Sequence, residues 1–161
     1  MHSEFGLQSL IFYAVVYAIM NVGVFYFIQI MENNGLKTIE EYAGLGRKYP
    51  SLGVAILLIM ISLIGLPPTG GFTAKLLIFT SLWEYYNSTQ SEYLLWLFVL
   101  GLINTVIALF YYLKIPYYFY MKEFEEERIV KLSIQNKITL LFFPILLVIL
   151  FLKSNLILEI F

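Results

Sequence analysis

The chain has 161 residues, of which 60% are hydrophobic and 18% aromatic, and its mean hydropathy is +0.81. These values lie far outside the usual range of a soluble domain and predict an integral membrane protein in contact with the lipid bilayer. The formal charge is −1, and the absence of cysteine and the single histidine exclude disulfides, thiolate metal sites and a histidine-rich metal centre. We therefore expect no bound cofactor in this chain, and we expect no nucleic-acid partner.

Four segments are long and apolar enough to cross a membrane, for which a helix needs about 20 residues. They lie at about 7–31, 51–86, 93–121 and 138–158. The predicted fold class is an all-α integral membrane protein with four transmembrane helices, the second of them discontinuous. We expect one membrane domain that covers residues 1–161.

The first span carries a stripe of polar side chains at helical spacing. Tyr13, Tyr17 and Asn21 follow one another at intervals of four residues, so they share one face of a helix. Tyr17 and Asn21 are candidates for lining a hydrated path. The alternative, which we favour, is that they only form interhelical hydrogen bonds, worth about 0.6 kcal/mol each in membranes.

More polar segments connect the spans. The segment 32–50 mixes charges, glycines and a closing proline, so it predicts a loop with a short surface helix at about 38–42. The sequence "NSTQSE" links the second and third spans. In 122–137, charged and apolar residues alternate enough to predict an amphipathic helix on the membrane surface.

Basic residues are concentrated in two of these connecting segments, which indicates an orientation. Only Lys153 falls on the opposite side of the membrane. Because basic loops stay in the cytoplasm, we expect both charged loops inside and both termini outside. The basic residues of the two charged loops are Lys37, Arg47, Lys48, Lys122, Arg128, Lys131 and Lys137.

The second span contains the sequence "GLPPTGGFTAK", with helix breakers where lipid is expected. As one straight helix, 51–86 would be about 53 Å long, against roughly 30 Å of hydrocarbon. Prolines lack amide donors, and glycines allow conformations closed to other residues. The helix is therefore expected to stop at Leu66 and to restart near Phe72. The breakers are Pro67, Pro68, Gly70 and Gly71.

An interruption at this depth constrains its surroundings. Lipid cannot hydrogen-bond free amides and carbonyls, so unwound backbone must be buried in protein or must face water. An ordinary proline kink is the alternative, and it would be the better interpretation of the breakers alone. A broken helix next to a charge is more informative, because that combination recurs in ion and proton transporters.

The charge is Lys75, one turn into the second half-helix and about 15 Å from its outer end. Burial and the positive end of the half-helix dipole disfavour the ammonium form, whereas an opposing glutamate would favour it. A lysine between such influences can act as a proton relay. The alternatives are a permanently charged lysine in a structural ion pair and a lysine that snorkels to the interface.

Polar residues in the third span raise similar choices. Asn104 and Thr105 lie mid-span and are candidates for the hydrated path, with interhelical hydrogen bonding again favoured. Lys114 lies about 21 residues into the span, so we favour snorkelling at the cytoplasmic interface. A role of Lys114 in proton uptake from the cytoplasm stays open.

The sequence resembles a known family. The stretch "SLIGLPPTGGFTAKLLIF" at 62–79 is similar to the discontinuous-helix signature of the antiporter-like membrane subunits of respiratory complex I, above all its N chain. The stretches "YAIMNVGVF" at 17–25, "YAGLGRKYP" at 42–50 and "LINTVIALFYYLKIP" at 102–116 support it. The first motif is fairly specific, and the resemblance extends over nearly the whole chain in the same order.

The resemblance implies a function and partners. Lys75 would be the lysine of the outward-leading half-channel of a proton-translocating subunit, in a complex that uses NADH, FMN, iron–sulfur clusters and quinone. Its partners would be the other membrane subunits, in a bacterial cytoplasmic membrane or alternatively a mitochondrial or plastid one. Alternative functions are a cation/proton antiporter subunit and a structural membrane module with Lys75 in a fixed ion pair.

The resemblance covers only part of the family pattern. Members have fourteen spans, of which this chain matches the last four. The family's other functional residues, a glutamate and lysines on earlier spans, have no counterpart here. We therefore expect that this chain cannot contain a complete proton path alone, and that it is the C-terminal part of a larger fold. A split gene, a truncated gene and an engineered fragment are equally compatible with this.

Overall fold

The computed structural model describes residues 2–123 and 129–154, and within these ranges it contains helices and their connections but no strand. The all-α fold class is confirmed. The elements in chain order are α1 (His2–Asn33), η1 (Glu40–Tyr42), α2 (Leu45–Lys48), α3 (Pro50–Ile64), α4 (Gly70–Thr89), α5 (Glu92–Met121) and α6 (Ile134–Leu152).

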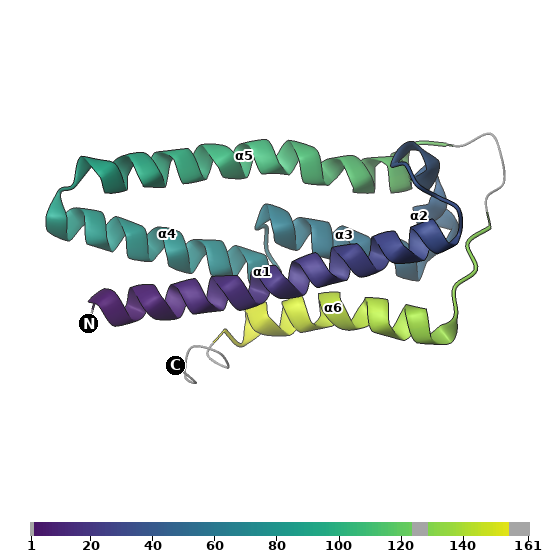
Figure 1. Ribbon diagram of the computed structural model, residues 1–161, viewed down its shortest axis with the longest axis horizontal. Helices are drawn as coiled ribbons and strands as arrows, with labels where there is room; N and C mark the ends of the chain where they lie inside the picture. Colours follow the sequence, from purple (N-terminus) through teal and green to yellow (C-terminus); the bar gives the residue numbers. More distant parts are fainter. Residues whose placement is uncertain (1, 124–128, 155–161) are drawn as a thin grey trace.

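The helices form an elongated bundle. Figure 1 shows α1 and α5 extending along most of its length, whereas α3 and α4 follow one another along it and each occupy only a part. Both α3 and α4 contact α1 and α5, and α6 packs against α1, α3 and α4. The N-terminus and the α4–α5 turn lie at one end of the bundle, and η1, α2 and the start of α6 lie at the other (Figure 1).

Three of the described helices are long and apolar enough to cross a membrane: Glu4–Asn33 of α1, Glu92–Met121 of α5 and Ile134–Leu152 of α6. The number rises to four if the pair Glu40–Lys48 and Pro50–Ile64, bent by 117°, counts as one span. The chain is thus a helical membrane protein. That α3 and α4 together form one discontinuous crossing stays a prediction, because the bent pair joins α3 to the preceding segment Glu40–Lys48 and not to α4.

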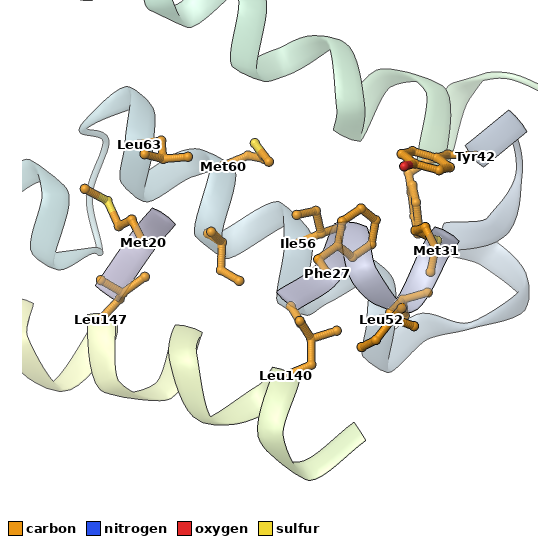
Figure 2. Packing of buried hydrophobic residues seen from close by; sticks show 14 of the residues in the cluster. Met20, Phe27, Met31, Tyr42, Leu52, Ile56, Met60, Leu63, Leu140 and Leu147 are labelled. Atoms are coloured by element: carbon orange, nitrogen blue, oxygen red, sulfur yellow. The ribbon is translucent and has the colours of Figure 1, made fainter. Parts of the chain in front are cut away.

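The packed core lies around α1, α3 and α6. Figure 2 shows Phe27 of α1, Ile56 of α3 and Leu140 of α6 converging there, and all three are fully or almost fully buried. Phe27 also packs against Tyr42 and Phe119, with ring centroids 5.6 Å away in both cases. This aromatic cluster joins α1 to η1 and α5, so one end of the bundle is held together by apolar contacts.

The connections differ in part from the sequence predictions. The short helix expected at 38–42 is present as η1, but the following helix α2 was not predicted. Helix α2 packs against α5, and Gly46 makes this possible. A Cβ at residue 46 would lie 2.9 Å from the Phe119 carbonyl oxygen and 3.0 Å from the Tyr120 ring. Only a glycine therefore allows this close contact.

The prediction of an amphipathic helix over 122–137 is wrong for residues 129–133, which are not helical. Residues 124–128 of this segment, including Arg128, lie outside the described residues. The reason for the non-helical backbone at 129–133 is local hydrogen bonding. Val130 N–H donates to the Tyr49 hydroxyl at 2.9 Å, and Lys131 N–H donates to Asn34 Oδ1 at 2.7 Å. Ser133 then caps α6 by accepting from the Asn136 N–H at 3.1 Å.

The fourth span also has other boundaries than predicted. Helix α6 begins four residues earlier than the expected 138 and ends at Leu152 rather than at about 158. The predicted end falls within 155–161, outside the described residues.

Candidate functional site

The interruption between α3 and α4 is present, but its boundaries differ from the prediction. Helix α3 ends at Ile64 and α4 begins at Gly70, two residues earlier at each end than expected. Pro67 and Pro68 lie in the break, whereas Gly70 and Gly71 form the first turn of α4. The physical reason is a capping motif at Gly65 that stops α3 before the prolines.

The end of α3 is a Schellman motif. Gly65 has a φ of +87°, in the left-handed region that favours glycine. Its N–H donates to the Ser62 carbonyl at 3.0 Å, and the Leu66 N–H donates to the Ile61 carbonyl at 3.1 Å. These bonds satisfy two of the four carbonyls that a helix C-terminus leaves without partners.

The start of α4 is held against the end of α3. Gly71 N–H donates to the buried Ser62 hydroxyl at 3.1 Å, and the Thr69 hydroxyl donates to the Leu66 carbonyl at 2.7 Å. A Cβ on Gly71 would overlap the Ser62 carbonyl, and one on Gly70 would lie 3.1 Å from the Leu147 carbonyl of α6. Contrary to the prediction, these two glycines therefore serve close backbone approach, since neither has a positive φ.

Lys75 completes the capping of α3. Its Nζ donates to the Leu63 carbonyl at 3.2 Å and to the Ile64 carbonyl at 2.7 Å. These are the two C-terminal carbonyls that the Schellman motif leaves free, and the negative end of the α3 dipole favours a cation there. The half-buried lysine has no acidic partner among the described residues.

Beside Lys75 lies a cavity of about 740 Å³ between α1, α4 and α5. Its lining combines the lysine with hydroxyl, phenol and amide groups and with apolar side chains. The polar residues of the lining are Ser9, Tyr13, Tyr17, Lys75, Ser81, Tyr85, Asn104, Thr105 and Tyr112. An apolar cavity would stay dry, whereas polar partners of this kind can hold water.

The structure brings several predicted residues together in this cavity. Tyr17, Asn104 and Thr105 line it with Lys75. Thr105 donates to the Gly101 carbonyl of its own helix at 3.1 Å, whereas the Asn104 amide has no hydrogen bond among the described residues. Among the described residues, Asn104 and Thr105 therefore form no interhelical hydrogen bond.

Two other predicted residues lie outside the cavity. Asn21 donates to the Tyr17 carbonyl on its own helix at 2.7 Å, so it does not line this cavity, and its amide joins no second helix among the described residues. The ammonium of Lys114 lies 3.7 Å from Glu40 Oε1 and 5.9 Å from the Tyr118 ring centroid. Lys114 thus contacts η1 at the end of the bundle, and its snorkelling to the cytoplasmic interface stays a prediction.

The sequence reasoning missed Gly65 as a neighbour of Lys75, and it missed Tyr112 and Ser81 as residues that line the cavity. A glycine directly after an apolar helix and before prolines is a recognisable C-terminal signal, so Gly65 could have been found. Tyr112 and Ser81 lie on helices without a distinct polar face, and nothing in the local pattern marks them. In the described part of the chain, no three His, Cys, Asp or Glu side chains are grouped to hold a metal ion.

These features define a class of protein: a helical membrane protein with a lysine at an interrupted helix beside a cavity lined by both apolar and polar side chains. Residues 1–108 match the family model described as the transmembrane part of NADH:quinone oxidoreductase and Mrp antiporter. The chain belongs to this family, and the resemblance found in the sequence is confirmed.

Relatives and a solved structure agree with this. The chain is 37% identical to NADH-quinone oxidoreductase subunit N 2 of Chloroherpeton thalassium over 76% of its length and 23% of that protein. It is 36% identical to subunit N of Pelagibacter ubique over 98% of its length and 32% of that protein. It thus spans about a quarter to a third of the length of these relatives.

The fold also resembles a chain in the structure of respiratory complex I from Thermus thermophilus with bound aureothin. The TM-score is 0.72 and the sequence identity 27%, over 94% of this chain and 34% of that chain.

Proposed function

We propose that this chain is part of a proton-translocating membrane subunit of NADH:quinone oxidoreductase, and that it contributes the outward-leading half-channel around the interrupted helix. The observation that supports this most directly is the position of Lys75, which lies at the interruption and lines the cavity together with other polar side chains. The family membership and the names of the relatives support the same function.

In this proposal Lys75 holds and passes on a proton. The carbonyls of Leu63 and Ile64 bind the ammonium form, and water in the cavity can accept a proton from it. The phenols of Tyr13 and Tyr17 and the amide of Asn104 supply hydrogen-bonding partners for such water. No covalent or redox step is assigned to this chain. NADH, FMN, the iron–sulfur clusters and quinone would bind to other subunits of the complex.

The proposal includes partners and an orientation. Because the chain spans a third or less of its relatives, other membrane segments would supply the rest of the proton path. We propose a bacterial cytoplasmic membrane, with the two basic segments in the cytoplasm and the α4–α5 turn outside. The chain has no cysteine, so single cysteines at Lys37 and Ser91 can be tested with an impermeant thiol reagent. Labelling of position 37 from the outside would contradict the orientation.

The decisive experiment replaces Lys75 in the assembled complex. Lys75→Ala is expected to lower NADH-driven proton transfer by on the order of a hundredfold, the usual contribution of a positioned proton-transfer group. Incorporation of the subunit is expected to be unchanged. Lys75→Arg is the matched variant, because it keeps the charge and the donors but does not release a proton. Normal pumping by both variants would contradict the proposal.

Two other functions make different predictions. A cation/proton antiporter subunit is compatible with the family description, and copurification with flavin and iron–sulfur subunits would argue against it. A structural module with Lys75 in a fixed ion pair predicts that Lys75→Ala prevents assembly. The lack of an acidic partner for Lys75 among residues 2–123 and 129–154 argues against such a pair within this part of the chain.

A further inference from the structure

The side chain of Lys75 crosses the end of α3 directly over Gly65. A Cβ placed on Gly65 would lie 2.6 Å from Cδ of Lys75, 3.2 Å from its Cε and 3.4 Å from its Nζ. Real Cβ atoms do not approach carbon atoms so closely. The lysine therefore takes a path that exists only because residue 65 has no side chain.

This path leads to the acceptors of the ammonium group. From it, Nζ reaches the carbonyls of Leu63 and Ile64, which belong to the last turn of α3. The lysine stem is flexible, whereas the carbonyls are held by the helix, so a side chain at residue 65 would displace the lysine. The displaced ammonium would lose both carbonyls and would move toward the adjoining cavity.

We propose that Gly65 is a positioning residue for Lys75, which holds the ammonium group on the end of α3 and sets its place relative to the cavity. This inference rests on the proposed function where it concerns proton transfer. The positioning itself is a statement about geometry, and it can be tested without pumping.

A merely structural role of Gly65 is the competing explanation, because any L-residue is strained at its φ of +87°. The chain contains a matched control for this strain. Gly35 has a φ of +80° and ends α1 with the same motif, with its N–H 2.9 Å from the Glu32 carbonyl and the Leu36 N–H 3.0 Å from the Met31 carbonyl. A Cβ on Gly35 would meet no atom within 4 Å.

The first test measures the exposure of the lysine amine. Membranes that contain the full subunit are treated with a permeant amine-acylating reagent, and modification of Lys75 is quantified by mass spectrometry relative to the exposed Lys37. Gly65→Ala is expected to raise the rate of Lys75 acylation at least about threefold, because a displaced amine is less shielded. Gly35→Ala is expected to leave it unchanged.

A second variant keeps the test valid if Gly65→Ala folds poorly. Asparagine tolerates a positive φ better than alanine, yet its side chain still meets the lysine. Gly65→Asn is therefore expected to increase acylation of Lys75 in the same way. Unchanged acylation in a folded Gly65 variant, or an equal increase in Gly35→Ala, would overturn the proposal.

Pumping by the assembled complex separates this inference from the proposed function. Gly65→Ala is expected to lower proton transfer severalfold relative to Gly35→Ala. If Lys75→Ala pumps normally while Gly65→Ala still increases acylation, the proposed function fails and the positioning stands. If Lys75→Ala abolishes pumping while acylation in Gly65→Ala is unchanged, the positioning fails and the function stands.

Discussion

The two ends of the bundle are built differently. Around η1, Phe27, Tyr42 and Phe119 pack their rings together and are nearly inaccessible. Around α4, the side chains of α1 and α5 leave the cavity with its mixed polar and apolar lining, and Tyr17 is 45% exposed. The interruption lies between the two ends (Figure 1). The comparison indicates that the packed end holds the helices in place, so that the other end can keep an open space with polar groups beside Lys75.

The largest effect on stability is expected at the packed end. Phe27→Ala removes a fully buried ring that joins α1 to η1 and α5, and it should lower the free energy of unfolding by about 3–5 kcal/mol. Tyr17→Ala at the cavity should cost less than about 1 kcal/mol, since its ring is only partly covered. Denaturation of the detergent-solubilised subunit measures the free energy of unfolding of both variants. Equal losses would mean that the two ends do not differ in packing.

The next largest effect concerns the contact between the half-helices. In Gly71→Ala the new methyl group would overlap the Ser62 carbonyl, which belongs to the backbone and cannot rotate away. We expect a loss of about 1–3 kcal/mol, as for other overpacked sites. Gly6→Ala is the control, because its Cβ would meet only the Ser81 hydroxyl, at 3.2 Å. Equal stability of the two variants would show that α3 and α4 can separate at little cost.

A smaller effect is expected from the polar lining of the cavity. Asn104→Leu removes an amide that can hold water, and it should slow proton transfer about tenfold, equal to about 1.4 kcal/mol in the barrier. Stability should change little. Asn21→Leu is the matched control outside the cavity, and pumping should stay near normal. If Asn21→Leu lowered proton transfer more than Asn104→Leu does, the path would lie along another face of α1.

The smallest effect is expected at the packed end of α5. Lys114 and Glu40 are both well exposed at a separation of 3.7 Å, so their ion pair should contribute less than about 1 kcal/mol. Lys114→Gln should therefore change neither stability nor pumping measurably. Proton pumping at several pH values checks this. Impaired pumping with normal stability would support a role of Lys114 in proton uptake, and the cavity would then be only part of the path.

The sequence predicted the fold class and the interruption well. Long apolar segments and the pair Pro67 and Pro68 act locally, so α1, α5, α6 and the break could be found without knowing the tertiary contacts. The 117° bend between Glu40–Lys48 and α3 was not predicted, and neither was the close approach of Gly46 to α5, which involves residues far apart in the sequence. The predicted helix over 129–133 failed for a similar reason, because Tyr49 and Asn34 hold that backbone from other parts of the chain.

The candidate site was only partly predictable. Lys75 was conspicuous as a charge in an apolar segment, but the sequence did not predict which groups would bind its ammonium. They are the carbonyls of Leu63 and Ile64, and the glycine that gives access to them was overlooked. Asn21 and Tyr17 looked equivalent in the sequence, yet only Tyr17 lines the cavity.

The sequence by itself determined that this chain is a helical membrane protein with an interruption and a lysine one turn beyond it. Hydropathy and the backbone limits of proline and glycine act over a few residues, so they can be read along the chain. Only the tertiary structure decided what Lys75 binds and which polar groups share its cavity. Helices in a membrane are apolar on nearly every face, so their pattern does not reveal how each is rotated about its axis.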